Sequence, residues 1–370
     1  MNSSNSRITH IIMMVCGVGG FLFSESCSKD SENKISISTL DFQPDTLPEL
    51  VAEDVWYPKD SIYTQKISVF DDDILLVKNK VHDGPFLEVY NLNDSTLITT
   101  LLPHGAGPNE FTDIQISPLG GNTIQISELG KNRFANLNIL SLKDFPEPSL
   151  EFEVYPVEIQ FSLQYHNFED KLLAQNMYHF FSQAKNISQP EHRFLTLPHN
   201  QTTMNMPKRE YWPVNVNQGF IAKKPDDSMV WFVSRDSSLV EIYNKDLQLV
   251  KVIKGPVDMG EPPYHVDANQ YTGMKDIAYF GGKPIAYYDC VYDSNRIALL
   301  YYGKFWNPFE MPIENLPSYI FVMDWEGNLQ RAYKAPAHLF NISLSKDPNV
   351  FYATIADEDD NPKPIKLTVR

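Results

Sequence analysis

The chain has 370 residues, with 31 Lys and Arg against 47 Asp and Glu and a formal net charge of −16. Its apolar content of 42% and aromatic content of 12% exclude a disordered chain. The negative charge argues against binding nucleic acid or anionic lipid through a basic surface. The 26 Pro residues outnumber the 17 Gly residues, which favours strands and tight turns over a helical bundle.

Residues 1–26 have the pattern of a signal peptide and are set aside from the fold. Arg7 supplies a positive charge, and the apolar run Ile8–Phe23 follows it. This run is shorter than the about 20 residues that a membrane-spanning helix needs. We therefore predict an exported protein.

The segment that ends at Cys27 resembles a bacterial lipoprotein signal, in which the cysteine is lipidated and becomes the mature N-terminus. It departs from the usual pattern because Ser24 and Glu25 stand where Leu and a small apolar residue are typical. The prediction is lipidation at Cys27, and a plain secretory signal is the alternative. Cys16 is a poorer candidate because it lies inside the apolar run.

Residues 27–49 form a tether and entry segment, and its acidic start resembles tethers that send lipoproteins to the outer leaflet of the outer membrane. We expect a lipid-anchored protein of the bacterial outer membrane, on its periplasmic or its surface-exposed face. Once Cys16 is removed and Cys27 is lipidated, Cys290 remains alone, so no internal disulfide is expected. The strand-like surroundings of Cys290 predict burial as a small hydrophobic residue.

Residues 50–370 are predicted to form a single domain of short β-rich runs that end in turn residues. Three hairpins repeat one pattern: an alternating apolar strand that ends in Asn or Asp, a polar turn, a Leu, a second strand and a closing Pro. These hairpins are Leu87–Pro103, Leu239–Pro256 and Tyr319–Pro336, and Phe134–Leu142 resembles a degraded copy. We expect one short helix at most, within His265–Ala278.

Repeated hairpins of this kind are typical of the outer strands of β-propeller blades. The roughly 320 residues of the domain would make six blades of about 53 residues or seven of about 46, against roughly 40 to 50 in common propeller repeats. We predict an all-β fold, a β-propeller of six blades of four-stranded antiparallel sheets, with seven blades as the alternative. The uneven spacing of the hairpins requires long loops, such as Lys304–Pro317.

The segment His104–Phe111 follows the first hairpin and reads HGAGPNEF. A G-x-G-P-x-E-F segment between blades, together with these hairpins and this N-terminus, resembles the TolB-like six-bladed β-propeller lipoproteins of bacteria. The resemblance covers essentially the whole mature chain. It implies the fold and the location but no particular activity.

The glycines of this segment favour a tight crossover between blades over a phosphate-binding loop, because strand-like residues follow where a dinucleotide-binding loop would open a helix. Gly105 and Gly107 permit positive φ angles. Pro108 stiffens the crossover, and Phe111 fills the core between blades. Glu110 has two interpretations: it accepts backbone N–H groups in the crossover, or it faces the central channel.

Two aromatic loops, Lys304–Phe309 and Tyr211–Pro213, are further candidates for ligand contact. Exposed Trp and Tyr rings stack on sugars and anchor interfaces. The alternative is that these loops only cover the ends of blades. The candidate ligand-contacting residues are His104, Asn109, Glu110, Trp212 and Trp306.

Motifs for catalysis and for metal binding are missing from the sequence. It has no G-x-S-x-G, H-E-x-x-H or C-x-x-C motif, and its nine His residues are scattered. We predict no catalytic residue, no metal site and no cofactor. The acidic runs Asp71–Asp73 and Asp357–Asn361 leave calcium as an alternative, with solvated turns as the ordinary explanation.

The favoured function is a binding or scaffolding module for an unknown envelope protein or glycan. We expect a monomer that does not bind nucleic acid. One alternative is a glycan hydrolase or lyase with acidic residues at the mouth of the propeller channel, which would need two suitably spaced carboxylates. A second alternative is a ligand sensor that signals to an envelope partner.

Overall fold

The chain divides into two units, Met1–Lys34 and Ile35–Arg370. The computed structural model describes residues 35–43, 46–58, 64–79, 84–154, 165–168, 171–175, 194–198, 219–259, 264–268, 275–279, 282–358 and 360–369, all in the second unit. These residues form strands joined by turns, with short 3₁₀ helices at η2 (Leu129–Lys131), η3 (Ile139–Lys143) and η6 (Ile313–Asn315). Within them, no helix has the length and apolar character to cross a membrane.

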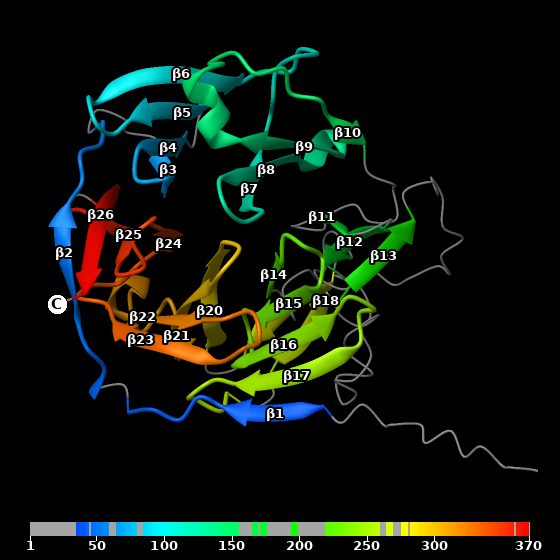
Figure 1. Ribbon diagram of the computed structural model, residues 1–370, viewed down its shortest axis with the longest axis vertical. Helices are drawn as coiled ribbons and strands as arrows, with labels where there is room; N and C mark the ends of the chain where they lie inside the picture. The colour runs from blue at the N-terminus through cyan, green and yellow to red at the C-terminus, as the bar shows by residue number, and fades with distance from the viewer. Residues whose placement is uncertain are drawn as a thin grey trace, which may run out of the picture. The chain divides into compact units, whose positions relative to one another are not determined.

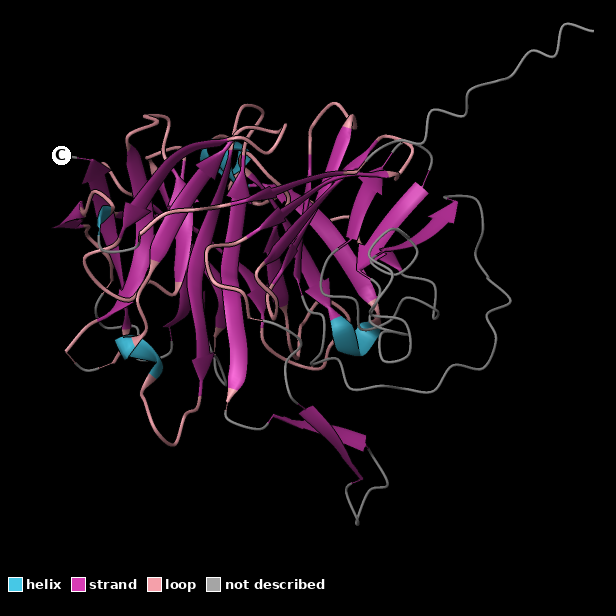
Figure 2. Ribbon diagram, turned by 90° about the horizontal axis from the view of Figure 1, so that it is seen from below, coloured by secondary structure: helices cyan, strands magenta, loops and turns pink. Residues whose placement is uncertain are grey.

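The described strands form seven sheets, and six of them surround a common centre (Figure 1); we number these six as blades 1 to 6 in chain order. Seen from the side in Figure 2, the strands run between the two faces of this ring. Among the described residues, five blades have four or more strands and blade 3 has three. These blades are antiparallel except where β1 joins blade 4. The result confirms the predicted propeller.

The first three blades lie between residues 64 and 198. Blade 1 consists of β3 (Thr64–Phe70), β4 (Ile74–Asn79), β5 (Pro85–Asn91) and β6 (Thr96–Pro103). Blade 2 consists of β7 (Gln115–Pro118), β8 (Thr123–Glu128), β9 (Arg133–Asn138) and β10 (Glu153–Val154). Blade 3 consists of β11 (Tyr165–Phe168), β12 (Lys171–Gln175) and β13 (Phe194–Pro198).

The other three blades include the two N-terminal strands. Blade 4 consists of β14 (Gly219–Lys223), β15 (Met229–Ser234), β16 (Leu239–Asn244), β17 (Leu249–Lys254) and β1 (Ser36–Thr39). Blade 5 consists of β20 (Lys283–Tyr292), β21 (Ile297–Trp306), β22 (Tyr319–Met323) and β23 (Leu329–Lys334). Blade 6 consists of β24 (Asn341–Leu344), β25 (Val350–Ala356), β26 (Pro362–Val369) and β2 (Leu50–Asp54).

The three repeated hairpins are the third and fourth strands of blades 1, 4 and 5, as predicted. Each pairing shifts register one residue before the Asn or Asp that ends the first strand, for example between Ile242 and Tyr243. The side chain of that residue then organises the turn: Asn244 Oδ1 accepts the N–H groups of Asp246 at 3.0 Å and Gln248 at 2.9 Å. Asn and Asp favour such turns because their short side chains bond the backbone locally.

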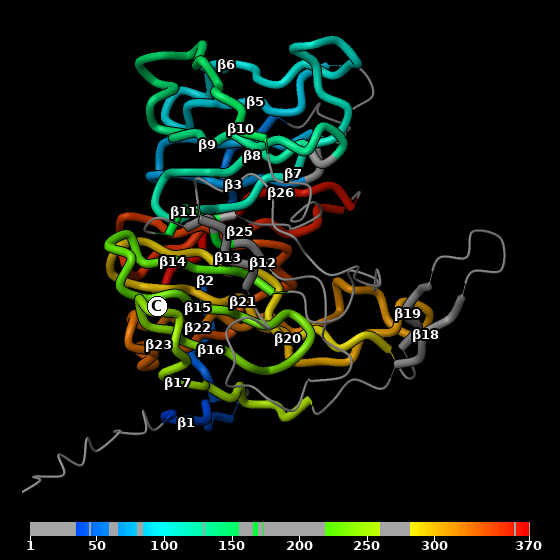
Figure 3. Tube along the Cα trace, turned by 90° about the vertical axis from the view of Figure 1, so that its right-hand side faces the viewer, coloured from blue at the N-terminus to red at the C-terminus, as the bar shows by residue number. Residues whose placement is uncertain are grey.

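Two expectations for other segments need correction. Residues 134–142 contain β9, the third strand of blade 2, but η3 follows it in place of a tight hairpin turn. The short helix allowed for 265–278 is not formed in the described residues, where β18 (Tyr264–Ala268) pairs with β19 (Lys275–Tyr279) in an antiparallel ribbon, labelled in Figure 3. The apolar residues of these strands alternate with a period of two, which suits a strand and not a helix.

Apolar clusters between neighbouring blades form the core. Separate clusters join blades 1 and 2, 3 and 4, 4 and 5, and 5 and 6. Between blades 4 and 5, the Trp231 indole donates to the Trp325 carbonyl at 3.1 Å, and the two rings meet edge to face. Cys290 is buried in the same cluster, as predicted, and burial raises the pKa of its thiol well above the ordinary value.

The N-terminal part of the second unit closes the ring. Strand β2 pairs with the C-terminal strand β26, so blade 6 combines both ends of the unit. Before it, β1 pairs with β17, the Phe42 ring lies 5.0 Å from the Phe321 ring, and the Lys334 N–H donates to Pro48 at 3.0 Å. Residues 36–43 and 46–54 therefore run along the outer edges of blades 4, 5 and 6.

Replacing Leu50 in the closing strand should destabilise the whole ring. Leu50 is 2% exposed and lies in the cluster between blades 5 and 6. We expect Leu50→Ala to lower the free energy of unfolding by about 2 to 5 kcal/mol. Urea unfolding measures it, with the exposed Glu53→Ala in the same strand as the control, expected to stay within about 0.5 kcal/mol of the wild type. Equal losses in both variants would contradict this role of β2.

Candidate functional site

A pocket of about 620 Å³ lies at the centre of the ring. Its described walls come from five blades. Blade 1 contributes β3 and β4, blade 2 contributes β7, blade 4 contributes β14 and Arg235, and blade 5 contributes β20. Blade 6 contributes residues in or next to β24, β25 and β26. The pocket lies at the end of the channel where β3, β7, β14 and β24 begin. Its volume is in the range of small-molecule sites.

At the opposite end of the channel, the turn between β7 and β8 reaches across the ring. The Gly121 N–H of blade 2 donates to the Tyr292 carbonyl of blade 5 at 2.9 Å, across the ring between blades three positions apart. Gly120 has a φ of +90°, and a Cβ added there would lie 2.3 Å from the Tyr292 ring. Only glycine permits this approach. A cavity of about 60 Å³ remains beside this contact.

Three cations contribute to the lining of the central pocket: Lys66, Lys78 and Arg235. The Lys78 ammonium donates to the Ile114 carbonyl at 2.7 Å. Burial lowers the pKa of Lys78; the nearby Asp113 carboxylate raises it, and the Lys66 ammonium lowers it again. The Arg235 guanidinium lies over the Tyr288 ring, 5.2 Å from its centre.

Two carboxylates also line the pocket, Asp289 and Asp360. Asp289 is 5% exposed and uses both oxygens on the backbone: Oδ1 accepts the Cys290 N–H at 3.0 Å, and Oδ2 accepts the Ile342 N–H at 3.0 Å. This carboxylate therefore joins blade 5 to blade 6. Its position is fixed by the backbone of both blades.

The G-x-G-P-x-E-F segment forms a crossover between blades 1 and 2. His104 and Phe111 make a parallel β-bridge, and the Gly105 N–H donates to the Phe111 carbonyl at 2.9 Å. Glu110 Oε2 accepts the Gly107 N–H at 2.7 Å, and the Lys131 ammonium donates to the Glu110 carbonyl at 2.6 Å. The Glu110 carboxylate thus binds the backbone of its own crossover.

The remaining crossover residues split between core and surface. Phe111 is 5% exposed in the cluster of blades 1 and 2, where its ring lies 5.4 Å from Phe152. The His104 ring lies 5.5 Å from Phe86. Pro108 and Asn109 are exposed. None of these residues lines the central pocket.

The loop after β21 is held by local hydrogen bonds and presents aromatic side chains. The Trp306 indole donates to the Met311 carbonyl at 2.9 Å, and Asn307 Oδ1 accepts the Phe309 N–H at 3.1 Å. Trp306 is half-buried, while Phe309 is 96% exposed. Trp212 and Cys27 lie outside the described residues.

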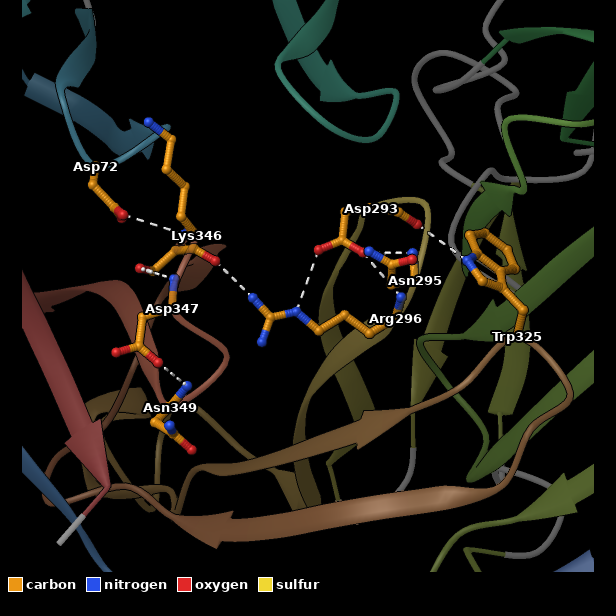
Figure 4. Close-up of polar contacts among 9 residues, drawn as sticks. Asp72, Asp293, Asn295, Arg296, Trp325, Lys346, Asp347 and Asn349 are labelled. Atoms are coloured by element: carbon orange, nitrogen blue, oxygen red, sulfur yellow. Dashed lines mark hydrogen bonds and ion pairs between the residues drawn. The ribbon is translucent and has the colours of Figure 1, made fainter.

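The acidic run Asp71–Asp73 lies at the far end of β3 from the pocket and is matched by lysines. Asp71 pairs with the Lys346 ammonium at 2.8 Å, and Asp73 pairs with Lys143 at 2.8 Å. Figure 4 shows Asp72 accepting the Lys346 backbone N–H, at 3.2 Å, where the turns of blades 1 and 6 meet. These carboxylates therefore join neighbouring blades.

The same face carries an arginine that joins blades 5 and 6 (Figure 4). Arg296 donates to the Ser345 carbonyl at 2.6 Å and to Asp293 Oδ2 at 3.3 Å, while the Trp325 indole donates to the Asp293 carbonyl at 3.1 Å. In the second acidic run, Asp357 accepts the Asn361 N–H at 2.8 Å. Within the described ranges, no group of three His, Cys, Asp or Glu side chains is placed to hold a metal ion.

The sequence interpretation did not select the pocket cations. Lys66 lies near the start of β3 after Thr64 and Gln65, Lys78 follows the apolar run of β4, and Arg235 follows directly after β15. The sequence feature that could have indicated these residues is a single cation near the end of a strand. This feature does not show which strands meet at the centre of the ring.

Placing a side chain at Gly105 should strain the crossover. Gly105 has a φ of +154°, and an added Cβ would lie 2.0 Å from Glu110 Oε2. We expect Gly105→Ala to lower the free energy of unfolding by about 1 to 3 kcal/mol. Gly130→Ala is the matched control, because the nearest atom to its Cβ is 3.8 Å away, and it should cost nothing. Chemical unfolding that gives both variants the same stability would contradict the strain.

In the described part of the chain, six sheets around a central channel, with a pocket at one end and a turn that reaches across the other, have the architecture of a six-bladed β-propeller. The sequence model of the TolB-like 6-blade propeller-like family matches residues 51–347. The chain belongs to this family, as the resemblance predicted. Six blades, and not the alternative of seven, agree with both findings.

A solved structure similar to the chain supports the fold. The chain is similar to a member of the DUF4221 family from Bacteroides vulgatus, with 11% identity, a TM-score of 0.51 and coverage of 86% of this chain and 97% of that chain. It is also similar to a protein of Bacteroides fragilis described as exported, with 13% identity, a TM-score of 0.46 and coverage of 90% of this chain and 99% of that chain. A third similar structure is virginiamycin B lyase from Staphylococcus aureus, with 10% identity, a TM-score of 0.40 and coverage of 87% of this chain and 99% of that chain. These similarities concern the fold alone, and only the first has a TM-score above 0.5. No curated protein matches the chain.

Proposed function

We propose that this chain is an exported, lipid-anchored binding module of the bacterial cell envelope, and that its ligand binds in the central pocket. The observation that carries the proposal is the asymmetry of the channel. One end holds a pocket of about 620 Å³ walled by five blades, and the Gly121–Tyr292 contact spans the other. A pocket of this size at the centre of a ring of sheets can bury most of a small ligand's surface.

Binding fits the pocket better than glycan hydrolysis does. A glycosidase needs two carboxylates about 5 to 9.5 Å apart, one of which transfers a proton. Of the two carboxylates in this wall, Asp289 has both oxygens on backbone N–H groups, which leaves Asp360 for such chemistry. The cations in the wall suit recognition of a ligand more directly.

The location rests on the N-terminal sequence. The signal pattern of residues 1–26 directs export, and a lipid on Cys27 would anchor the propeller to a membrane that it does not span. The partner would then be an envelope protein or glycan that reaches the pocket. Two experiments test the pocket and the anchor separately.

Filling the pocket should abolish capture of the natural ligand. We expect Gln115→Trp, in the pocket wall, to lose at least about tenfold in binding of glycans on an array and of partners from the native envelope, since a bulky ring competes for the ligand's volume. Thr100→Trp, on the exposed face of the outer strand β6, is the matched control and should bind like the wild type. Unchanged capture by Gln115→Trp would refute the pocket as the binding site.

The anchor should depend on one cysteine. Cells fed a labelled fatty acid should label the wild type and lose the label in Cys27→Ala, because the thiol carries the lipid. Cys290→Ala is the control, since Cys290 is buried in the core and should leave labelling unchanged. Equal labelling of Cys27→Ala and the wild type would rule out this anchor.

A further inference from the structure

The central pocket concentrates positive charge in a chain whose formal net charge is −16. Lys66, Lys78 and Arg235 reach it from two different blades. One of the two carboxylates in the wall, Asp289, is engaged by the N–H groups of Cys290 and Ile342. The local excess of cations is therefore a property of the pocket and not of the surface as a whole.

Two of these cations lie directly opposite each other. Lys66 of β3 and Lys78 of β4 are paired residues in the antiparallel ladder of blade 1. Side chains at such positions have Cβ atoms about 4.5 to 5.5 Å apart, and like charges there destabilise the sheet. A sheet that retains this pair at the wall of a pocket gains stability when an anion occupies the space before it.

The state of Lys78 agrees with this geometry. Burial lowers the pKa of its ammonium, and the charge of Lys66 lowers it further against the opposing effect of Asp113. The Lys78 ammonium donates to the Ile114 carbonyl at 2.7 Å, and an ammonium group can donate three hydrogen bonds in all. An anion in the pocket would offer further acceptors and a compensating charge.

The rest of the wall suits the body of an organic ligand. Phe220, Tyr288 and Phe340 come from blades 4, 5 and 6, and the amide side chains of Gln115 and Asn341 lie among them. Aromatic faces pack against rings, and amides can bond hydroxyl groups. The volume of about 620 Å³ exceeds what a bare oxyanion needs.

We propose that the central pocket binds a small organic anion, in which a carboxylate, sulfate or phosphate group meets Lys66 and Lys78 and a ring-bearing body contacts the aromatic wall beside Arg235. This inference deepens the proposed function and rests on it. It identifies the ligand by its chemical class.

The test compares matched ligands by isothermal titration and thermal unfolding of the full mature chain. Glucuronate and glucose 6-phosphate are the anionic probes, glucose is their neutral counterpart, and inorganic phosphate is the bare anion. We expect both sugar anions to bind and to raise the unfolding temperature, and glucose to do neither. The two sugar anions also distinguish a carboxylate from a phosphate as the preferred group.

Three variants assign the binding to the cations. Lys66→Gln and Lys78→Gln should each weaken binding of the sugar anions about tenfold, the usual effect of losing a charge-assisted hydrogen bond. Lys245→Gln, an exposed lysine in the β16–β17 turn, makes the same change in net charge and should bind like the wild type. Without ligand, Lys66→Gln should unfold at the same or a higher temperature than the wild type, because it removes a like-charge pair.

Several outcomes would overturn the proposal. If neither sugar anion binds, or if both lysine variants bind as tightly as the wild type, the pocket is not an anion site. Phosphate that binds as tightly as glucose 6-phosphate would refute the contact between the aromatic wall and the ligand's body. If Gln115→Trp abolishes capture while the lysine variants retain it, the binding function stands and the anionic class is wrong.

Discussion

The pairing of β2 with β26 is the contact on which the rest of the ring depends. A propeller blade has two apolar faces and buries both only when it has a neighbour on each side. Blade 6 takes its outer strand, β2, from residues 50–54, so the last blade along the chain is incomplete without this N-terminal strand. The preceding residues also contact blades 4 and 5, which ties half of the ring to one continuous segment.

Closure of the ring also positions the pocket. The Asn341 amide and the Thr354 hydroxyl of blade 6 donate to the Ile67 carbonyl of blade 1 at 2.9 and 3.0 Å, directly beside the pocket. Lys66 directly precedes Ile67 in β3, so the contact between blades 1 and 6 also positions Lys66. Asp289 has the same role between blades 5 and 6. Polar groups near the channel thus hold the wall in place.

Local features of the fold could be predicted from the sequence. The hairpins were recognisable because alternation of apolar residues and a turn-forming Asn or Asp act over a few residues. At residues 265–278 the sequence interpretation allowed one short helix, whereas the described residues form the β18–β19 ribbon that their period-two alternation indicates. The pocket cations could not be predicted, because Lys66, Lys78 and Arg235 belong to no common motif and Arg235 is far from the two lysines in the sequence.

The sequence by itself determined the class of fold, the repeated hairpins, the glycine-rich crossover and the family, because each depends on residues close together in the chain. Only the tertiary structure decided what lies at the centre. Lysines from blade 1, an arginine from blade 4 and aromatic rings from blades 4, 5 and 6 share one wall once six sheets bury their faces against each other. Ring closure brings these side chains together, and no local pattern encodes which of them will meet.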